Sequence, residues 1–293
     1  LKISEGCNWK CGYCAIPLIR GGFRSRDMQS VLDEIRALAE QGVREHVLVA
    51  QDTSRFGMDT HGRSLLPELM VRAADIPGVE WLRVLYCYPD EVDDTLLEVM
   101  ASRPNICRYL DLPLQHADPQ LLRRMNRRGD IEQTRAFLKK AREMGFTLRT
   151  TFITGFPGET EEDFTQLAEF AKDVQFERMG CFAYSQEEDT PAASLPDQVE
   201  EEVKEHRAEI LMDRQMAIME AQGLELVGQT LEVLVEGFDR YAECWFGRSY
   251  RDAPDIDGKV FFTTEGKRPR LGSFVKVTVT GCMDCDLTGE LVE

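Results

Sequence analysis

The sequence lacks several features that would place it in particular classes of protein. It contains no run of about 18 apolar residues, so no helix is predicted to cross a membrane. It has only 12 prolines in 293 residues, and 43% of its residues are hydrophobic, which is typical of an ordered globular protein. Its nine cysteines, of which three are clustered and most others single, do not resemble the dense framework of a secreted module. We therefore expect a reducing, cytoplasmic environment.

An excess of positive charge is also missing. The chain has 35 Lys and Arg against 52 Asp and Glu, a net charge of −17. Proteins that grip nucleic acid need clustered Lys and Arg to neutralise phosphates, so a basic partner protein suits this chain better. The first residue, Leu1, lies inside a predicted strand with no initiator methionine or signal peptide before it. We expect the chain to begin within a longer protein.

Three cysteines, Cys7, Cys11 and Cys14, lie together in one short loop after an opening stretch that alternates apolar and polar residues. Three thiolates at this spacing indicate a shared metal centre. Structural zinc sites use four protein ligands, and no fourth is nearby. A cubane iron–sulfur cluster held by three cysteines would keep one iron open for another ligand. The loop favours such a cluster, and a zinc knot in a non-enzymatic adaptor protein is the alternative.

Beyond this loop, short apolar strands alternate with amphipathic helices. Helices are predicted at 27–41, 65–74, 94–102, 131–144 and 161–173, and strands at 43–50, 80–86, 107–112, 146–154 and 178–184. With the opening strand these make six β/α units, and continuous apolar strands imply a parallel sheet with right-handed crossovers. Polar residues follow the carboxyl end of each strand. In a barrel these ends share one mouth, so we predict a partial barrel rather than an open sheet.

A charged helix is predicted at about 196–222, with Ile210, Leu211, Ile218 and Met219 packing on the barrel. Gly223 is the predicted boundary, which divides the chain into domains 1–222 and 223–293. Strands at 230–235, 259–262 and 274–279, separated by glycine turns, predict a small antiparallel β-barrel of the oligomer-binding (OB) type with about five strands. Residues 224–293 contain eight Lys and Arg against thirteen Asp and Glu, a net charge of −5.

The spacing C-x3-C-x2-C, with Tyr13 before the third cysteine, resembles the radical S-adenosylmethionine (SAM) superfamily, whose fold is a partial (β/α)6 barrel. Six further stretches resemble its methylthiotransferases: CAIP at 14–17, RG at 20–21, SR at 25–26, DLPLQH at 111–116, MNR at 125–127 and GFPGET at 155–160. The small barrel resembles their TRAM domain, so the resemblance covers essentially the whole chain. It implies a [4Fe–4S] cluster on the three cysteines, SAM bound at the open iron, a reducing electron donor, and an auxiliary [4Fe–4S] cluster on an N-terminal domain absent from this sequence.

Two branches of that family differ in substrate. MiaB-type enzymes methylthiolate an adenosine of transfer RNA, and RimO-type enzymes modify the β-carbon of an aspartate in small-subunit ribosomal protein twelve. The acidic small barrel argues against RNA binding by the TRAM domain and favours docking of a basic ribosomal protein. Residues 247–249 and 252–258 also resemble the RimO branch. We predict the ribosomal protein as substrate, with transfer RNA as the alternative.

The resemblance also implies the chemistry and the residues that serve it. A 5′-deoxyadenosyl radical would abstract hydrogen from the aspartate before sulfur adds, so no catalytic acid or base is predicted. The predicted cofactor-binding residues are Tyr13, Gln51, Asp52, Gln115, His116, Arg149, Thr151 and Gly155. Structural roles in turns or core polar pairs are the alternatives for most of them. Arg248, Ser249, Asp255 and Asp257 are predicted to dock the substrate. The pair Cys282 and Cys285 has no partner pair and is interpreted as structural.

Overall fold

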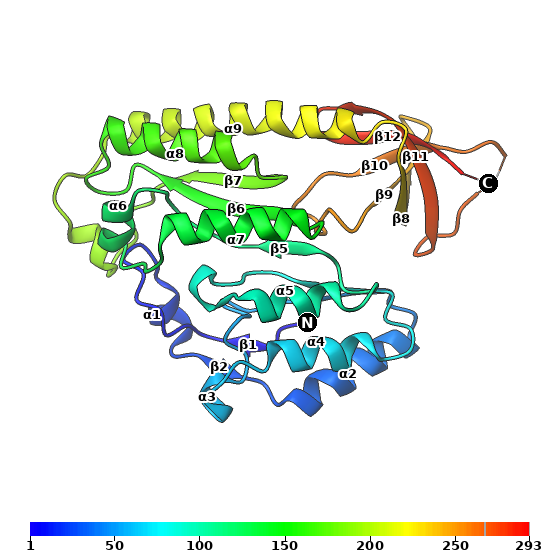
Figure 1. The fold of residues 1–293 in the computed structure, drawn as a ribbon, viewed down its shortest axis with the longest axis horizontal. Helices are drawn as coiled ribbons and strands as arrows, with labels where there is room; N and C mark the ends of the chain where they lie inside the picture. The colour runs from blue at the N-terminus through cyan, green and yellow to red at the C-terminus, as the bar shows by residue number, and fades with distance from the viewer. Residues whose placement is uncertain (267, 293) are drawn as a thin grey trace.

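The computed structural model describes residues 1–266 and 268–292, and its larger part is an open array of parallel strands (Figure 1). The strands are β3 (Glu45–Leu48), β4 (Trp81–Val84), β5 (Tyr109–Asp111), β6 (Thr147–Thr154) and β7 (Arg178–Ala183). Single parallel bridges join Lys2 to Val49 and Leu82 to Ile106, so the spatial order follows the chain order. Among the described strands β7 pairs only with β6. The predicted partial barrel is confirmed.

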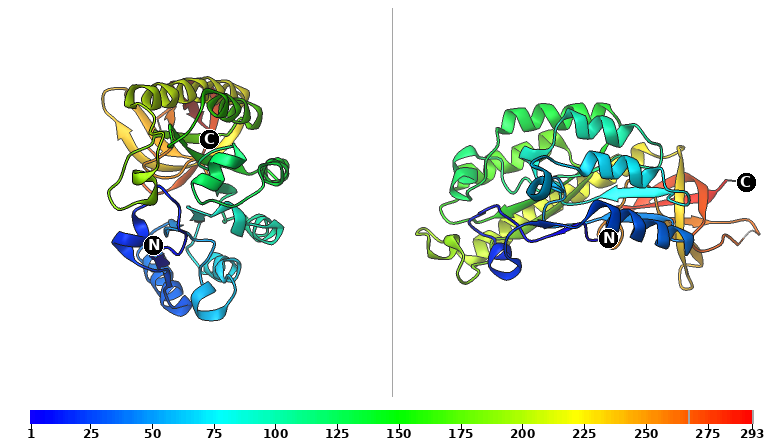
Figure 2. Two further views of the ribbon diagram at one scale, coloured as in Figure 1. Left: turned by 90° about the vertical axis from the view of Figure 1, so that its left-hand side faces the viewer. Right: turned by 90° about the horizontal axis from the view of Figure 1, so that it is seen from below.

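The helices between these strands agree with the predicted ranges to within one residue at each end. They are α2 (Met28–Glu40), α4 (Leu66–Ala74), α5 (Asp94–Ala101), α7 (Ile131–Glu143) and α8 (Glu161–Val174), and they cover the outside of the array (Figure 2). Side chains of Asp27, Asp93, Asp130 and Thr160 cap four of them by accepting backbone N–H groups. Three short helices, α1 (Ile16–Arg20), α3 (Met58–His61) and α6 (Pro119–Arg124), were not predicted because one or two turns show no periodicity.

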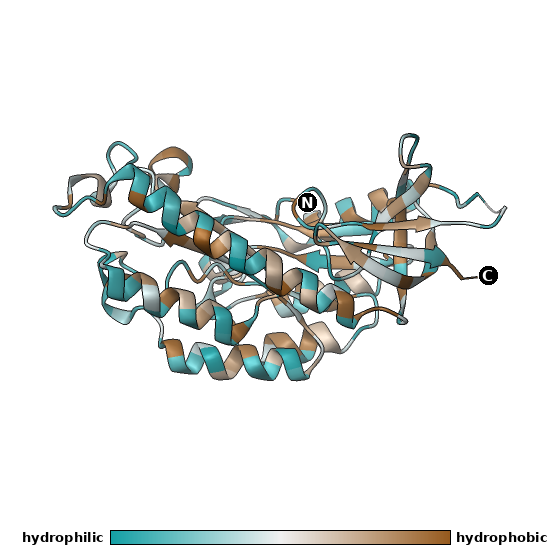
Figure 3. Cartoon of the chain, turned by 90° about the horizontal axis from the view of Figure 1, so that it is seen from above, coloured by the Kyte–Doolittle hydropathy of each residue, from teal (hydrophilic) through white to brown (hydrophobic). Residues whose placement is uncertain are grey.

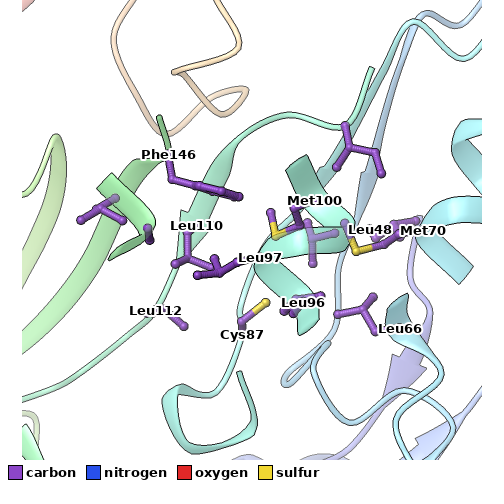
Figure 4. Close-up of a cluster of buried hydrophobic side chains, with 14 of the residues drawn as sticks. Leu48, Leu66, Met70, Cys87, Leu96, Leu97, Met100, Leu110, Leu112 and Phe146 are labelled. Carbon is purple, nitrogen blue, oxygen red and sulfur yellow. The ribbon is translucent and has the colours of Figure 1, made fainter. Parts of the chain in front are cut away.

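The main core lies between the strands and these helices. Leu48 of β3 and Leu110 of β5 face Met70, Leu97 and Met100 from the helices, all essentially buried (Figure 4). Each such side chain stabilises the fold by about 1.5–3 kcal/mol relative to exposure. The opening strand is short: β1 (Ser4–Glu5) pairs antiparallel with β2 (Arg24–Ser25).

Helix α9 (Glu201–Glu225) runs along the array to the small barrel (Figures 1 and 3). Most of its buried residues are polar or charged. Of the four apolar residues predicted to pack on the barrel, only Leu211 is fully buried. Lys204 and Gln215 are buried instead, because they donate to the carbonyl oxygens of Tyr184 (3.0 Å) and Phe176 (2.7 Å). Helix α9 is long, but neither it nor any other helix in the described residues is both long and apolar enough to cross a membrane.

The helix also extends past the predicted boundary at Gly223. A Cβ atom at Gly223 would lie 2.4 Å from Cys282 Sγ, so glycine allows the helix to pack closely on the small barrel. The five barrel strands are β8 (Thr230–Asp239), β9 (Cys244–Arg248), β10 (Val260–Thr263), β11 (Phe274–Met283) and β12 (Asp286–Leu291), closed in the order β10-β12-β11-β8-β9.

The small barrel is not wholly antiparallel, which corrects the sequence prediction. Strands β10 and β12 pair in parallel, while the other four pairs are antiparallel. A closed ring with an odd number of strands cannot alternate direction throughout, so at least one neighbouring pair must be parallel. Val233, Val260, Phe262 and Val277 fill its interior.

A segment that we call the plug, residues 249–257, extends from the small barrel into the amino-terminal end of the partial barrel. Arg83 on β4 donates to the carbonyl oxygen of Tyr250 at 2.8 Å, and Arg178 on β7 pairs with Asp252. The hydroxyl of Tyr109 on β5 donates to Asp257 at 2.5 Å. The plug therefore joins the two domains through buried polar contacts, at the end of the barrel opposite the carboxyl ends of the strands.

Candidate metal centre

The three clustered cysteines line one cavity of about 480 Å³ at the carboxyl ends of the strands. Residues that follow three different strands also line it, including Gln51, Tyr86, Tyr88, Pro113 and Gln115. Within the described residues, no three His, Cys, Asp or Glu side chains stand close enough to share one metal ion. Three clustered thiols supply the ligand number of an iron–sulfur cluster with one open iron, whereas a structural zinc site uses four protein ligands, so the donor set fits the cluster better.

The cysteine loop is fixed by backbone contacts at both ends. Gly6 has a φ of +77°, and a Cβ atom there would lie 2.2 Å from the carbonyl oxygen of Gly22, so only glycine fits. The side-chain oxygen of Gln51 accepts the Gly6 N–H at 2.8 Å. On the other side, Gly12 donates its N–H to the carbonyl oxygen of Met125 at 2.8 Å. These contacts position the backbone of the cysteine loop.

Burial affects the protonation of the loop thiols. It raises the pKa of Cys7 to about 11 and also raises the pKa of Cys14. Both groups are therefore protonated at neutral pH when no metal is bound, and metal binding must release their protons.

An aromatic column stands beside the loop. Trp9, between Cys7 and Cys11, stacks on Tyr88 with ring centroids 4.0 Å apart and an interplanar angle of 9°. The guanidinium carbon of Arg127 lies 4.3 Å from the Tyr88 ring centroid, and that of Arg55 lies 5.0 Å from Trp9. Each of the two rings thus has a guanidinium group over the face that is turned away from the other ring. Such cation–π contacts stabilise both rings.

Three of the predicted cofactor-binding residues, Tyr13, Gln51 and Gln115, line the cavity. Burial raises the pKa of Tyr13, whose hydroxyl lies 3.4 Å from Arg127 Nη1. Gln115 and Tyr86 both have positive φ values, +73° and +60°, and each follows the end of a strand. Such strained positions cost about 1–3 kcal/mol each in non-glycine residues and concentrate at functional sites.

Asp52 and His116 are buried next to the cavity but do not line it. The Asp52 carboxylate accepts the indole N–H of Trp9 at 2.6 Å and the backbone N–H of Ser54 at 3.0 Å, so it positions the loop. Burial raises the pKa of Asp52. His116 accepts the Asp118 N–H on Nδ1 at 2.9 Å, and its Nε2 lies 3.5 Å from Glu159 Oε2. With Nδ1 accepting, we assign the ring proton to Nε2.

The remaining predicted cofactor residues also lie outside the cavity lining. Gly155, with a φ of +70°, donates its N–H to Glu159 at 2.9 Å, and Lys204 packs where a Cβ atom would be. Thr151 supports the cavity indirectly, because its carbonyl oxygen accepts the Gln115 N–H at 2.8 Å. Arg149 pairs with Asp111 at 2.8 Å and faces the plug. Cofactor contacts by these residues stay predictions.

The predicted docking residues are mostly not at the surface. Arg248 is buried and pairs with Glu45 (2.5 Å) and Glu236 (2.7 Å), and the buried Ser249 donates to Asp252. The Asp257 side chain is only 4% exposed because it receives the Tyr109 hydroxyl inside the plug. Arg248 and Asp257 connect the two domains, Ser249 orders the plug internally, and of the four predicted residues only Asp255 is exposed.

Sequence reasoning missed three residues that shape the site: Trp9, Tyr88 and Arg127. Each lay in a stretch that the sequence had already marked, namely the cysteine loop, the polar residues after β4, and the MNR segment. Their stacking depends on contacts between residues far apart in the sequence, 79 positions from Trp9 to Tyr88 and 39 positions from Tyr88 to Arg127, which periodicity cannot reveal.

A partial parallel barrel with three thiols at its carboxyl mouth defines a class of protein, the cofactor-dependent enzymes that carry a metal cluster at a barrel opening. The family model described as the Radical SAM superfamily matches residues 1–171, so the chain belongs to this superfamily. A model of the TRAM domain matches residues 227–292. Membership implies a [4Fe–4S] cluster and SAM as cofactors, and leaves the zinc-knot alternative without support.

Two curated relatives are similar over the whole chain. Both are named ribosomal protein uS12 methylthiotransferase RimO: that of Desulfitobacterium hafniense is 49% identical and that of Desulforamulus reducens is 47% identical, each over 100% of this chain. The chain spans about 66% of the length of either relative.

Among solved structures, the radical SAM methyltransferase TsrM of Kitasatospora setae, with cobalamin and a [4Fe–4S] cluster bound, superimposes with a TM-score of 0.52. It is 21% identical and covers 62% of this chain and 36% of its own. At this identity the likeness shows the shared fold alone.

Proposed function

We propose that this chain is the catalytic part of a methylthiotransferase that modifies an aspartate of ribosomal protein uS12, the small-subunit protein twelve. One observation carries the proposal: three thiols line a single cavity in a chain 49% identical, over its full length, to an enzyme of that name. The sequence resemblance to the RimO branch supports the same conclusion.

In this proposal Cys7, Cys11 and Cys14 hold the cluster, and Tyr13, Gln51 and Gln115 contact SAM in the same cavity. When bound, the cluster and SAM would supply one-electron radical chemistry able to activate a carbon–hydrogen bond of the aspartate. The chain's own residues orient these groups and restrict water. Trp9, Tyr86 and Tyr88 provide aromatic walls around the cavity, which protect a reactive species from solvent.

Charge supports a protein rather than an RNA substrate. The net charge of −17 creates a field that attracts a strongly basic ribosomal protein and repels phosphate. A MiaB-type action on transfer RNA would require the small barrel to bind a polyanion despite its net charge of −5. From its cysteine usage we also propose that the enzyme acts in the cytoplasm and takes its electron from a reducing donor.

The cofactor part of the proposal is tested by SAM cleavage. The chain is reconstituted with iron and sulfide without oxygen, mixed with SAM and dithionite, and assayed for 5′-deoxyadenosine by chromatography. We expect cleavage by the unsubstituted chain. A protein that binds iron but forms no 5′-deoxyadenosine would contradict the proposal.

The substrate part is tested by binding. Calorimetric titration with purified uS12 should give binding that weakens as salt increases, since it depends on opposite charges. Titration with unmodified transfer RNA serves as the comparison. Tight retention of transfer RNA at moderate salt, together with no binding of uS12, would favour the MiaB-type alternative.

A further inference from the structure

The guanidinium group of Arg127 is buried beside the cysteine loop. Its side chain comes from the segment after α6, and the residue is only 6% exposed. Nη1 lies 4.0 Å from Cys11 Sγ and 3.4 Å from the Tyr13 hydroxyl, while Nη2 donates to the carbonyl oxygen of Pro113 at 2.8 Å. The Tyr88 ring covers one of its faces. Arg127 is therefore held against the loop from several sides.

Arg127 differs from the other buried arginines in its partners. Arg83, Arg178, Arg207 and Arg248 all form ion pairs with carboxylates. Within the described residues, no carboxylate lies within 4.0 Å of the Arg127 guanidinium; Asp90 is near enough to be affected by its charge but forms no ion pair with it. Its near neighbours are a carbonyl, a phenol, a thiol and a ring. A buried cation without a counter-charge is costly, so this position calls for a negative group in the cavity.

We propose that Arg127 is the counter-charge of the iron–sulfur cluster and favours its reduced state. This inference rests on the proposed function, in that the cluster must bind to the three cysteines. An oxidised [4Fe–4S]2+ core on three thiolates carries a net charge of −1, and one added electron brings it to −2. A fixed positive charge stabilises the second state more than the first. The electron comes from the external reductant, and no bond or proton changes in this step.

The surroundings of Arg127 keep its charge at the loop. Tyr88 is fixed by stacking on Trp9, and Trp9 is fixed by its hydrogen bond to Asp52. The guanidinium therefore cannot swing away when the loop is empty or when the cluster charge changes. Such preorganised charge acts at little reorganisation cost, which is the general basis of electrostatic stabilisation in enzymes.

The chain offers a matched control for this charge, because the next residue, Arg128, is exposed. Arg127→Gln and Arg128→Gln change the net charge equally, and Arg127→Lys keeps the charge at the buried position. The reduction potential of the reconstituted cluster is measured in each protein by electron paramagnetic resonance during a redox titration, in the absence of SAM. Circular dichroism checks that each variant is folded.

We expect Arg127→Gln to make reduction at least tenfold less favourable, which is 59 mV lower for a one-electron couple. Arg128→Gln should stay close to the unsubstituted protein, and Arg127→Lys should recover most of the difference. Loss of iron by Arg127→Gln but not by Arg127→Lys would also support the counter-charge role.

Three results would overturn the inference. The first is an equal reduction potential in Arg127→Gln and Arg128→Gln, and the second is loss of iron in both Arg127 variants. The third is an Arg127→Gln protein with an unchanged potential but weakened SAM binding, which would assign the guanidinium to the SAM carboxylate. If the unsubstituted chain binds no cluster, the proposed function fails instead, so the two failures are distinguishable.

Discussion

The two ends of the partial barrel both contain buried arginines, but these arginines differ in whether they have an ion-pair partner. At the amino-terminal end, the buried charged side chains are paired: Arg83 and Arg248 share Glu45, and Arg178 pairs with Asp252. At the carboxyl mouth, three thiols and the Arg127 guanidinium face a cavity with no ion-pair partner among the described residues. Paired charges stabilise the contact between the plug and the partial barrel, whereas a buried charge without a counter-charge at an opening is available to a charged ligand.

The substitution with the largest expected effect removes a cluster ligand at the carboxyl mouth and leaves the junction, the contacts of the plug with the partial barrel, intact. Cys11→Ala should abolish both the brown colour of the reconstituted cluster and SAM cleavage, because only two thiolate ligands remain. Stability of the cluster-free protein should change by less than about 3 kcal/mol.

The control is Cys87→Ala, since Cys87 is buried and also lines the cavity but lies outside the loop. This variant should keep the cluster. If Cys11→Ala retained cluster and cleavage, the metal assignment would be wrong.

The substitution with the next largest effect removes an ion pair of the junction and leaves the cavity at the carboxyl mouth intact. Arg178→Met should lower the free energy of unfolding by about 3–5 kcal/mol, since it leaves the Asp252 carboxylate buried without its partner. Urea denaturation measures this loss. The exposed pair of Arg36 and Asp33 supplies the control, and Arg36→Met should cost at most about 1 kcal/mol. Similar losses in the two variants would mean that the plug contributes nothing special to stability.

A smaller effect tests the turn beside the mouth. Gly155→Ala must adopt a φ of +70° and place its Cβ atom 1.9 Å from Lys204 Cγ. Gly272 has a φ of +75° with no atom within 4 Å of such a Cβ, so Gly272→Ala carries the backbone strain alone. We expect Gly155→Ala to be less stable than Gly272→Ala by about 1–3 kcal/mol in thermal unfolding, the usual cost of overpacking. Equal stabilities would show that Lys204 moves aside freely.

The smallest effect concerns acid sensitivity of the junction. Burial alone would raise the pKa of Glu45, but Arg83 and Arg248 outweigh it and hold that pKa below its ordinary value. Because the pKa of Glu45 is lower in the folded than in the unfolded chain, its ionised carboxylate stabilises the fold fully above the ordinary pKa. This stabilisation is lost as pH falls through the pKa of Glu45 in the folded chain. Stability should therefore decline less steeply in Glu45→Gln than in the unsubstituted chain between about pH 6 and about pH 3. If the stability of the two proteins declined equally with pH, Glu45 would not contribute to the acid sensitivity of the junction.

The same contrast explains what the sequence could predict. The five helices α2, α4, α5, α7 and α8 follow apolar periodicity and local caps, which are properties of neighbouring residues, and their bounds were predicted to within one residue. The shared location of the three cysteines could be predicted because their spacing is local too, and the structure places all three in one cavity; their role as cluster ligands stays a prediction. The roles of Arg248 and Asp257 could not, because an Arg and an Asp in a loop rich in Asp and Pro suggest a solvated surface unless the partners Glu45 and Tyr109 are known.

The polar face of α9 was missed for a related reason. Lys204 and Arg207 are buried because Tyr184 and Glu159 offer an oxygen at the right distance. Such pairing depends on the fold already being assembled. The parallel pair in the small barrel was predictable in principle, since an odd strand count requires it.

Helix α9 has a mechanical consequence. Near its start Lys204 fills the space over Gly155, and near its end Gly223 lies against Cys282, so one helix touches both the turn beside the mouth and the small barrel. Its 25 residues form a stiff rod about 37 Å long. The two domains therefore cannot tilt independently about the plug: a rotation of the small barrel has to carry the Gly155 turn with it or disrupt the packing of Lys204. A load applied at one end of the molecule reaches the cysteine-bearing end through a single continuous element.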